Sequence, residues 1–323
     1  MTMREVAELA GVSVAAVSRY LNGGYISGDK AARIQDAIDK TGYVRSNQAR
    51  SLRTGSTRLV GVVVPKINSE SISRLTAGVS EALQAAGYQM LLANTANDPA
   101  CEIEYLELLQ RYPVDGIILA GTVITPAHER FFTAASTPVV VTGQYVEGCN
   151  CVYFDDYEAA RDMGRHAARV SSGPVAYIGV TRGDAAAGVS REDGFRAGLA
   201  DEGVMLGEGM YRESPFSVDG GYECACELLN MTPRPCFIGC ATDTIAAGAL
   251  RALTEAGVEN PTCRVSGFGD NQLLRTLSGG IATIHFGYKT CGATAARMTL
   301  DAIGSGAPDT LRQVKLKHSV ILD

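Results

Sequence analysis

Apolar residues near the start of the chain recur at three- and four-residue spacing, the period of an amphipathic helix. Val6, Leu9 and Ala10 share one face of a first short helix, and Gly11 stands where that helix is expected to end. Ser13 follows where it can cap a second helix. Two short helices joined by so tight a connection predict a helix-turn-helix.

The second helix divides its side chains between two faces. Val17 and Leu21 share the apolar face. At about 100° per residue, Ser18 and Arg19 point away from it, whereas the angle of Val14 also suits the core. A small, polar and basic outer face is typical of a helix that enters the DNA major groove, where arginine reads guanine.

A third helix is expected to complete this N-terminal unit. Ser27 can cap it, Ile34 and Ala37 supply its apolar face, and Gly42 closes it.

From Leu59 onward, apolar strands alternate with helical stretches. The expected strands are 59–65, 88–94, 116–121, 138–143, 152–155, 175–180, 236–241, 264–268 and 282–285, and helices include 75–86, 102–109, 157–170 and 244–256. This rhythm predicts parallel sheets covered on both faces. About 265 residues exceed one ordinary domain, so we expect two doubly wound α/β lobes with a ligand cleft between them.

Charge is distributed unevenly along the chain. Residues 1–58 hold nine bases and five acids, a balance of +4, while the whole chain carries −6. A small basic module joined to a larger acidic one indicates a nucleic-acid contact confined to one end.

Composition argues against several classes of protein. The longest apolar run, 59–65, is far shorter than the ~18 residues of a membrane span. The N-terminal residues lack the apolar core of a signal peptide. The chain has nine cysteines, an odd number, whereas disulfide-bonded proteins usually have an even number. We therefore expect reduced cysteines that serve as small apolar side chains in the core. We therefore expect a cytoplasmic protein with no membrane partner.

Motifs of common enzymes are missing from the sequence. It contains no Gly-x-Ser-x-Gly, Gly-x-x-x-x-Gly-Lys or His-Glu-x-x-His, and its cysteines lack Cys-x-x-Cys spacing. Its four histidines lie far apart in sequence. We expect no catalytic residue, no cofactor and no metal site.

The N-terminal unit resembles the headpiece of the lactose-repressor family of bacterial transcription regulators. Residues 6–22 carry the pattern Val-Ala-x-x-Ala-Gly-Val-Ser-x-x-x-Val-Ser-Arg-x-x-Asn, and residues 49–55 read Ala-Arg-Ser-Leu-Arg-Thr-Gly. The resemblance implies that the second segment is a hinge helix, which orders on operator DNA and inserts a leucine into the minor groove. Arg45 and Ser46 replace the usual Pro-Asn before it.

The resemblance also assigns DNA contacts residue by residue. It implies base contacts from Val14, Ala15 and Arg19, phosphate contacts from Thr2, Ser13, Ser18 and Asn22, a further DNA contact from Ala49, and insertion of Leu52 into the minor groove. The implied organisation is a DNA-binding headpiece over 1–45, a hinge helix and linker over 46–58, and a ligand-binding and dimerisation domain over 59–323.

The acidic part resembles the sugar-sensing core of the same family, which is similar to periplasmic sugar-binding proteins. The resemblance is carried by Lys66 and by the segments 191–195, 240–249 and 265–268, and within the family it is greatest to repressors of sucrose or trehalose operons. It implies crossovers between the lobes near Asp155, His285 and Gly306.

Six side chains are thereby implied in effector binding. Arginine can fork onto hydroxyls or an anion, Thr and Asp accept hydroxyls, and Tyr can stack on a sugar ring. These residues are Lys66, Gln144, Arg191, Thr242, Asp243 and Tyr288. Gly269 stands where many relatives hold a hydroxyl-binding aspartate, and Asp270 beside it is a doubtful substitute.

The ligand remains open between a neutral sugar and a sugar phosphate. Two buried cations, Lys66 and Arg191, would need an anionic ligand or a nearby acid such as Asp243 or Asp270. We expect a homodimeric repressor of carbohydrate-utilisation genes that binds a pseudopalindromic operator. The alternatives are a regulator of the same fold that responds to a non-sugar ligand or a protein corepressor, a solute-binding protein, and a sugar-modifying enzyme.

Overall fold

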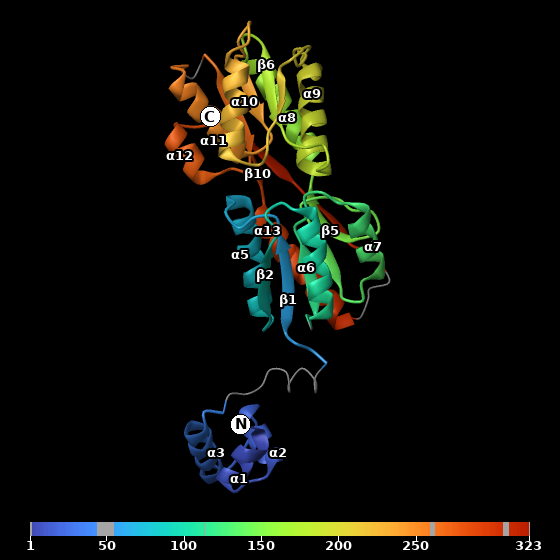
Figure 1. Ribbon diagram of the computed structural model, residues 1–323, viewed down its shortest axis with the longest axis vertical. Helices are drawn as coiled ribbons and strands as arrows, with labels where there is room; N and C mark the ends of the chain where they lie inside the picture. The colour runs from blue at the N-terminus through green and yellow to red at the C-terminus, as the bar shows by residue number, and fades with distance from the viewer. Residues whose placement is uncertain (1, 44–54, 113, 259–261, 306–309, 323) are drawn as a thin grey trace. The chain divides into compact units, whose positions relative to one another are not determined.

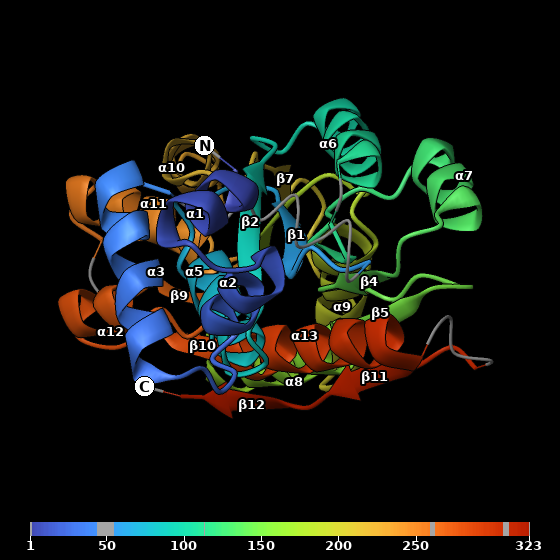
Figure 2. The ribbon, with the colours of Figure 1, turned by 90° about the horizontal axis from the view of Figure 1, so that it is seen from below.

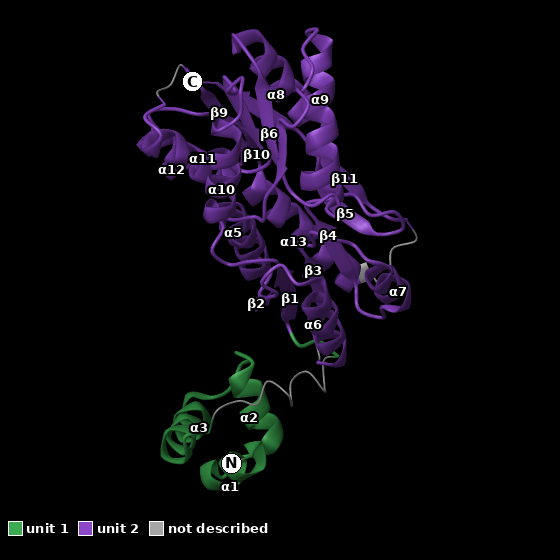
Figure 3. Cartoon of the chain, turned by 45° about the horizontal axis from the view of Figure 1, so that its top comes forward, with its two compact units in different colours: residues 1–57 green, residues 58–323 purple. Residues whose placement is uncertain are grey.

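The computed structural model describes residues 2–43, 55–112, 114–258, 262–305 and 310–322, in two compact units, 1–57 and 58–323 (Figure 3). The predicted hinge helix with Ala49 and Leu52 falls largely outside these described residues. So do Arg45 and Ser46, and predictions for these positions stay predictions.

Residues 2–43 of the first unit form three helices, as the sequence predicts: α1 (Met3–Ala10), α2 (Val14–Leu21) and α3 (Gly28–Thr41). Gly11 ends α1 and Gly42 ends α3, both in the left-handed conformation with φ of 59° and 61°. Ser27 precedes α3, but its side chain makes no capping hydrogen bond, which corrects that part of the prediction.

The core of the first unit settles the orientation of α2. Val6, Val17 and Ile34 are fully buried, whereas Val14 is 43% exposed. Val14 therefore belongs to the outer face of α2, on the same side as Ala15 and Arg19, both exposed.

Two α/β lobes make up the second unit (Figure 1). The strands of lobe 1, in sheet order, are β2 (Gln89–Asn94), β1 (Leu59–Val64), β3 (Gly116–Leu119), β4 (Val139–Thr142), β5 (Asn150–Phe154) and β11 (Gln313–Leu316). Its helices are α5 (Glu70–Ala85), α6 (Pro99–Arg111), α7 (Pro126–Ala134) and α13 (Tyr288–Ser305). Helices α6 and α7 cover one face of this sheet and α5 and α13 the other (Figure 2).

The second lobe repeats this plan. Its strands, in sheet order, are β7 (Tyr211–Glu213), β6 (Val175–Gly179), β8 (Phe237–Cys240), β9 (Arg264–Phe268), β10 (Ala282–Phe286) and β12 (His318–Ile321). Its helices are α8 (Asp156–Val170), α9 (Arg191–Asp201), α10 (Val218–Leu229), α11 (Asp243–Glu255) and α12 (Gln272–Ser278), and a π-helical turn spans Ala185–Ser190. All strand pairs in both sheets are parallel except β10 with β12.

The chain passes between the lobes three times. It crosses at Asp155, between β5 and α8, and at Gly287, between β10 and α13, close to the predicted positions. The third crossing is at Lys317, between β11 and β12, and not near Gly306. The sequence did not predict β7, β11 or β12, which are short strands at or near sheet edges.

Glycine allows α13 to lie directly against α5. A Cβ at Gly78 would lie 2.0 Å from the carbonyl oxygen of Lys289, and one at Gly292 would lie 2.0 Å from that of Leu75. This close packing fixes the start of α13, with Tyr288, beside α5 and the strand ends of lobe 1.

All nine cysteines are free thiols, as expected. Among the described residues, no helix is long and apolar enough to cross a membrane, and no group of three or more His, Cys, Asp or Glu side chains is arranged to hold a metal ion.

Candidate functional sites

The outer face of α2 is the first candidate site. Val14, Ala15 and Arg19 are exposed on it, and Ser18 is half-buried. A Cβ at Gly24 would lie 2.7 Å from Cγ of Arg19, so this glycine lets the following turn pack against the arginine stem. The face combines small apolar groups with one projecting guanidinium.

Two helix N-termini of the first unit carry hydroxyl caps. The hydroxyl of Thr2 accepts the Glu5 amide at 3.4 Å, and the hydroxyl of Ser13 accepts the Ala16 amide at 3.2 Å. Because each hydroxyl acts here as an acceptor, its own proton is free to be donated to a phosphate. The positive ends of α1 and α2 favour such an anion.

Asn22 ends α2, where its amide nitrogen donates to the carbonyl of Ser18 at 2.6 Å. This bond, with a longer one to the Ser18 hydroxyl at 3.5 Å, holds the side chain against the helix.

Ion pairs neutralise part of the basic charge of this unit. Arg4 pairs with Glu8, Arg33 with Asp29 and Lys40 with Asp36, each four residues apart. Arg33 also donates to the carbonyls of Ala10 and Gly11, at 2.5 and 2.7 Å, and so caps α1. Arg19 forms no ion pair with any described residue, which leaves its guanidinium available to a partner.

The second candidate site is a pair of adjoining cavities between the lobes, of about 140 and 130 Å³. They share Pro65, Arg191 and Tyr288 among their walls. Five of the six predicted effector residues line the first cavity: Lys66, Arg191, Thr242, Asp243 and Tyr288. Gln144 lines the second, where it is buried and donates to the carbonyl of Gly121 at 2.8 Å.

Arg191 is already neutralised within the protein. Its Nε donates to Oδ1 of Asp156 at 2.7 Å, and its Nη1 donates to the carbonyl of Ala241 at 2.7 Å. The rings of Phe268 and Phe286 lie 5.0 and 5.2 Å from the guanidinium carbon. Burial raises the pKa of Asp156, and Arg191 offsets part of that rise. The acid that pairs with Arg191 is thus neither Asp243 nor Asp270, the two candidates from sequence.

Lys66 makes a contact with the opposite lobe. Its Nζ donates to the carbonyl of Phe216 at 2.8 Å and lies 5.8 Å from the ring centre of that residue. Burial lowers the pKa of Lys66. Within the described part of the chain, the ammonium group is therefore bonded to a main-chain carbonyl and forms no ion pair with a carboxylate.

Asp243 places a buried carboxylate in the cavity wall at the start of α11. It accepts the Asn271 amide at 2.7 Å and the Thr283 hydroxyl at 2.8 Å. Burial raises the pKa of Asp243 to about 6. Gly269, with φ of 143°, leaves room for this carboxylate, because a Cβ there would lie 3.1 Å from its Oδ2.

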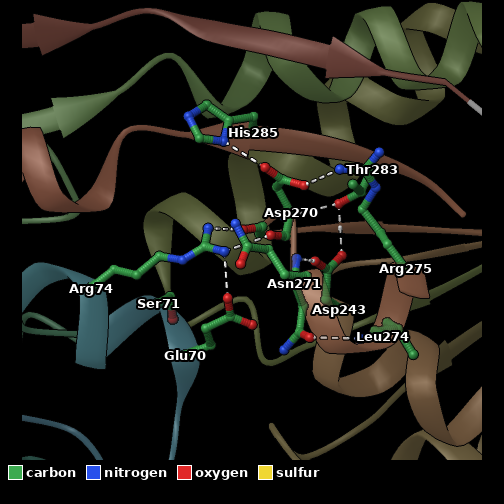
Figure 4. A network of polar contacts seen from close by, with 12 residues as sticks. Glu70, Ser71, Arg74, Asp243, Asp270, Asn271, Leu274, Arg275, Thr283 and His285 are labelled. Carbon is green, nitrogen blue, oxygen red and sulfur yellow. Dashed lines mark hydrogen bonds and ion pairs between the residues drawn. The ribbon is translucent and has the colours of Figure 1, made fainter. Parts of the chain in front are cut away.

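Asp270 does not replace the side chain that Gly269 lacks. Its carboxylate is bound by Arg275 Nη1 and by His285 Nδ1, each at 2.8 Å, and it does not line the described part of either cavity (Figure 4). The carboxylate of Asp243, by contrast, does line the first cavity.

Two further predicted residues are held by local contacts. The hydroxyl of Thr242 accepts the Ile245 amide at 3.3 Å and caps α11. The ring of Tyr288 packs edge-on against Phe154 and Phe286, and burial raises its pKa to about 12, which keeps the phenol neutral.

The sequence did not identify several residues of this site. Phe216, Asn271 and Glu70 line the first cavity, and Asp156 pairs with Arg191. Phe216 follows the unpredicted strand β7, so no pattern indicated its place. Asp156 adjoins the predicted crossover at Asp155, which was a usable signal.

Comparison with known proteins gives matches over nearly the whole chain. Residues 2–46 match the family described as bacterial regulatory proteins, lacI family, and residues 57–319 match the periplasmic binding proteins and sugar binding domain of the LacI family. The sucrose operon repressor of Staphylococcus xylosus is 30% identical over 295 residues, 90% of each chain. The HTH-type transcriptional repressor PurR of Actinobacillus pleuropneumoniae is 27% identical over 94% of this chain and 91% of its own length.

A solved structure shares the fold of the full chain. The lac repressor dimer bound to operator and the anti-inducer ONPF aligns with a TM-score of 0.86 at 19% identity, covering 99% of this chain and 97% of the other. This likeness extends over both units and both lobes.

Proposed function

The chain belongs to the LacI family of bacterial regulatory proteins, and we propose that it represses carbohydrate-utilisation genes under the control of a sugar bound between its lobes. The observation that carries the proposal is the composition of the interlobe cavities. Carboxylate, amide, hydroxyl and aromatic side chains gather there at the carboxyl ends of parallel strands, the usual place for a ligand in such sheets.

A neutral sugar suits this pocket better than a sugar phosphate. Arg191 is paired with Asp156 and so requires no anion from the ligand, and Lys66 already donates one hydrogen bond to the Phe216 carbonyl of the opposite lobe. Asp243 accepts hydroxyl protons, and the rings of Phe216 and Tyr288 provide apolar surface for a sugar face.

DNA binding is assigned to the first unit. Val14, Ala15 and Arg19 are proposed to contact base edges in the major groove, because they project together from α2. Thr2, Ser13, Ser18 and Asn22 are proposed to contact phosphates, with Ala49 and the wedge residue Leu52 at the hinge. No catalytic step is assigned to the chain, which would act in the cytoplasm, where its operator lies.

A second copy of the chain supplies the second half-site contact. Leu273 and Leu277 on α12 are 73% and 84% exposed, and Leu91 and Leu92 on β2 are 46% and 41% exposed. Both elements lie on the left side of the second unit in Figure 1. We propose that a homodimer covers this side, since large apolar groups left in water are typical of an interface.

Calorimetry on the full chain tests the effector assignment. Sucrose, trehalose, their 6-phosphates and a purine base are titrated in turn. Heat from a neutral disaccharide supports the proposal. Binding of the purine alone would favour the non-sugar alternative, and no binding of any sugar would contradict the effector assignment.

A further inference from the structure

We propose that Arg74 is a positioning residue for the effector site, and that it holds the two lobes closed over the pocket by binding the main chain of residues 269–271. The inference rests on the proposed function of the pocket. It concerns how readily the pocket closes, a property separate from which groups touch the ligand.

Arg74 lies on α5 of lobe 1 and reaches the opposite lobe. Its Nη2 donates to the carbonyl of Asp270 at 2.9 Å, and its Nη1 donates to the carbonyl of Gly269 at 3.3 Å (Figure 4). Glu70, one turn earlier on α5, pairs with the same guanidinium and fixes its direction. The arginine side chain is only 22% exposed, so these charge-assisted bonds are partly shielded from water.

Lobe 2 presents these two carbonyls without help from Arg74. Asp270 has φ of 51°, a left-handed conformation that costs free energy for a residue with a side chain. Contacts within lobe 2 hold it there: its amide donates to Thr283 Oγ1 at 3.2 Å, and its carboxylate binds Arg275 and His285. The loop therefore offers a preformed pair of acceptors to lobe 1.

The same loop also contacts the pocket carboxylate. The Asn271 amide donates to Asp243 Oδ2, and Thr283, which receives the Asp270 amide, donates its hydroxyl proton to Asp243 Oδ1. One loop thus joins Arg74 in lobe 1 to the proposed hydroxyl-binding group in lobe 2. Closure by Arg74 and the placing of Asp243 depend on the same short segment.

Arg74 can be changed without removing a pocket contact. Lys66 also bridges the lobes, through the Phe216 carbonyl, but it lines the cavity itself. Arg74 is not among the residues that line the described cavities. Substitution of Arg74 therefore changes lobe closure without removing a side chain of the cavity wall. Arg74→Ala also leaves Glu70, which lines the first cavity, without its ion-pair partner, and Arg74→Lys keeps a cation beside it.

The effect follows from the closed fraction of the protein. A ligand that binds only the closed lobes has an apparent Kd equal to its intrinsic Kd divided by that fraction. Loss of two charge-assisted hydrogen bonds is expected to weaken apparent binding by about tenfold.

A single-tryptophan reporter measures closure directly. The chain contains no tryptophan, so Phe216→Trp introduces one indole at the boundary between the lobes. In this background and without ligand, Arg74→Ala should shift the emission to longer wavelength and increase quenching by acrylamide. Arg74→Lys, which can reach one carbonyl, should give an intermediate shift.

Arg111→Ala is the matched control. Arg111 also pairs with a glutamate four residues earlier on a lobe 1 helix, Glu107, but on the exposed surface of α6. Circular dichroism and the Tm identify any variant that fails to fold. If Arg74→Ala does not fold, Arg74→Lys is compared with Arg111→Ala in its place. Emission of the Arg74 variants equal to that of the Arg111 control would overturn the proposal.

Sucrose and trehalose titrations separate this inference from the proposed function. An apparent Kd about tenfold higher in Arg74→Ala, with the Arg111 control unchanged, supports the positioning role, whereas an unchanged Kd contradicts it. Absence of sugar binding in the wild type would contradict the effector assignment, while the ligand-free emission still decides the role of Arg74 in closure.

Discussion

Asp156 and Arg191 form a buried ion pair, with Oδ1 and Nε 2.7 Å apart, that joins the first turn of α8 to the first turn of α9. The carboxylate supplies the negative charge that the pocket arginine needs. Arg191 is therefore not a cation without a partner, and it does not call for a phosphate group on the ligand.

Breaking this pair by truncating one partner should be costly. Asp156→Ala leaves a buried guanidinium without its carboxylate, so we expect a loss of about 3–5 kcal/mol in the free energy of unfolding. The double variant Asp156→Leu with Arg191→Met removes both charges and should lose less. Urea unfolding monitored by circular dichroism measures both, and equal losses in the two variants would contradict the ion-pair account.

Lys66 distinguishes a neutral from a phosphorylated ligand. Because its ammonium group is bonded to the Phe216 carbonyl, Lys66→Ala should weaken binding of a neutral disaccharide only through easier lobe opening, by less than about tenfold. Calorimetry with sucrose and sucrose 6-phosphate provides the comparison. Preferential binding of the phosphate in the wild type, lost in Lys66→Ala, would show that the ligand is anionic.

Asp243 should make stability depend on pH. The pKa of its carboxyl is about 6 in the folded protein against 3.8 as the ordinary value. Between these values the folded chain holds a proton that the unfolded chain has lost, so this contribution to stability is complete below about pH 4 and is lost as the pH rises through 6. In the wild type, the free energy of unfolding should fall between pH 4 and 7 with a slope that corresponds to at most one proton. Asp243→Asn removes that proton, so the slope should be smaller in the variant.

Binding of a sugar should show the opposite trend with pH. A hydroxyl that donates to Asp243 favours the ionised carboxylate, so affinity should rise between pH 5 and 7 in the wild type. Asp184 titrates in the same range, because burial also raises the pKa of its carboxyl to about 6. Its carboxylate, however, accepts the Ala186 and Ala187 amides and caps a turn. Affinity that stays flat with pH would mean that Asp243 makes no such bond.

Val14 and Val17 provide a matched pair of substitutions on one helix. Val17 is fully buried, so Val17→Ala should lower the Tm of the first unit by creating a cavity worth about 1–3 kcal/mol. Val14, 43% exposed, should tolerate alanine with little change in Tm but with weaker specific DNA binding. The reverse pattern in thermal unfolding and DNA anisotropy would place Val14 in the core.

Arg19 is expected to read a base. Arg19→Ala should cost about 1–3 kcal/mol of specific binding and relax the preference at one position of each half-site. Competition between selected and random DNA measures this. An equal loss on both DNAs would make Arg19 a phosphate contact.

The spacing of apolar residues and the capping residues at helix ends predicted most of the fold. Gly11, Ser13 and Gly42 determine the helix ends of the first unit through local backbone and capping chemistry, which sequence shows directly. The strands at the centre of each sheet were predicted from their continuous apolar runs, which arise because both their faces are buried. Strands β11 and β12 were missed because they are only four residues long and mix polar with apolar residues, whereas the edge strand β2 carries the apolar run 90–93.

The pocket was only partly predictable. Lys66, Thr242, Asp243 and Tyr288 meet there because each closely follows a strand end, a placement that the sequence indicates, whereas Arg191 begins α9 after the π-helical turn. Their partners depend on tertiary contacts between segments far apart in the chain. The pairs of Arg191 with Asp156 and of Arg74 with the Asp270 carbonyl, 196 residues away, have no local signal.

The most direct test is binding of DNA by the full chain with and without sugar. DNA selected in vitro should contain a pseudopalindrome with two half-sites, and a disaccharide that calorimetry shows to bind should release it by at least about tenfold in Kd. In Asp243→Asn that release should be reduced. Selected DNA without symmetric half-sites, or operator affinity unchanged by every sugar that binds the protein, would contradict a sugar-controlled repressor.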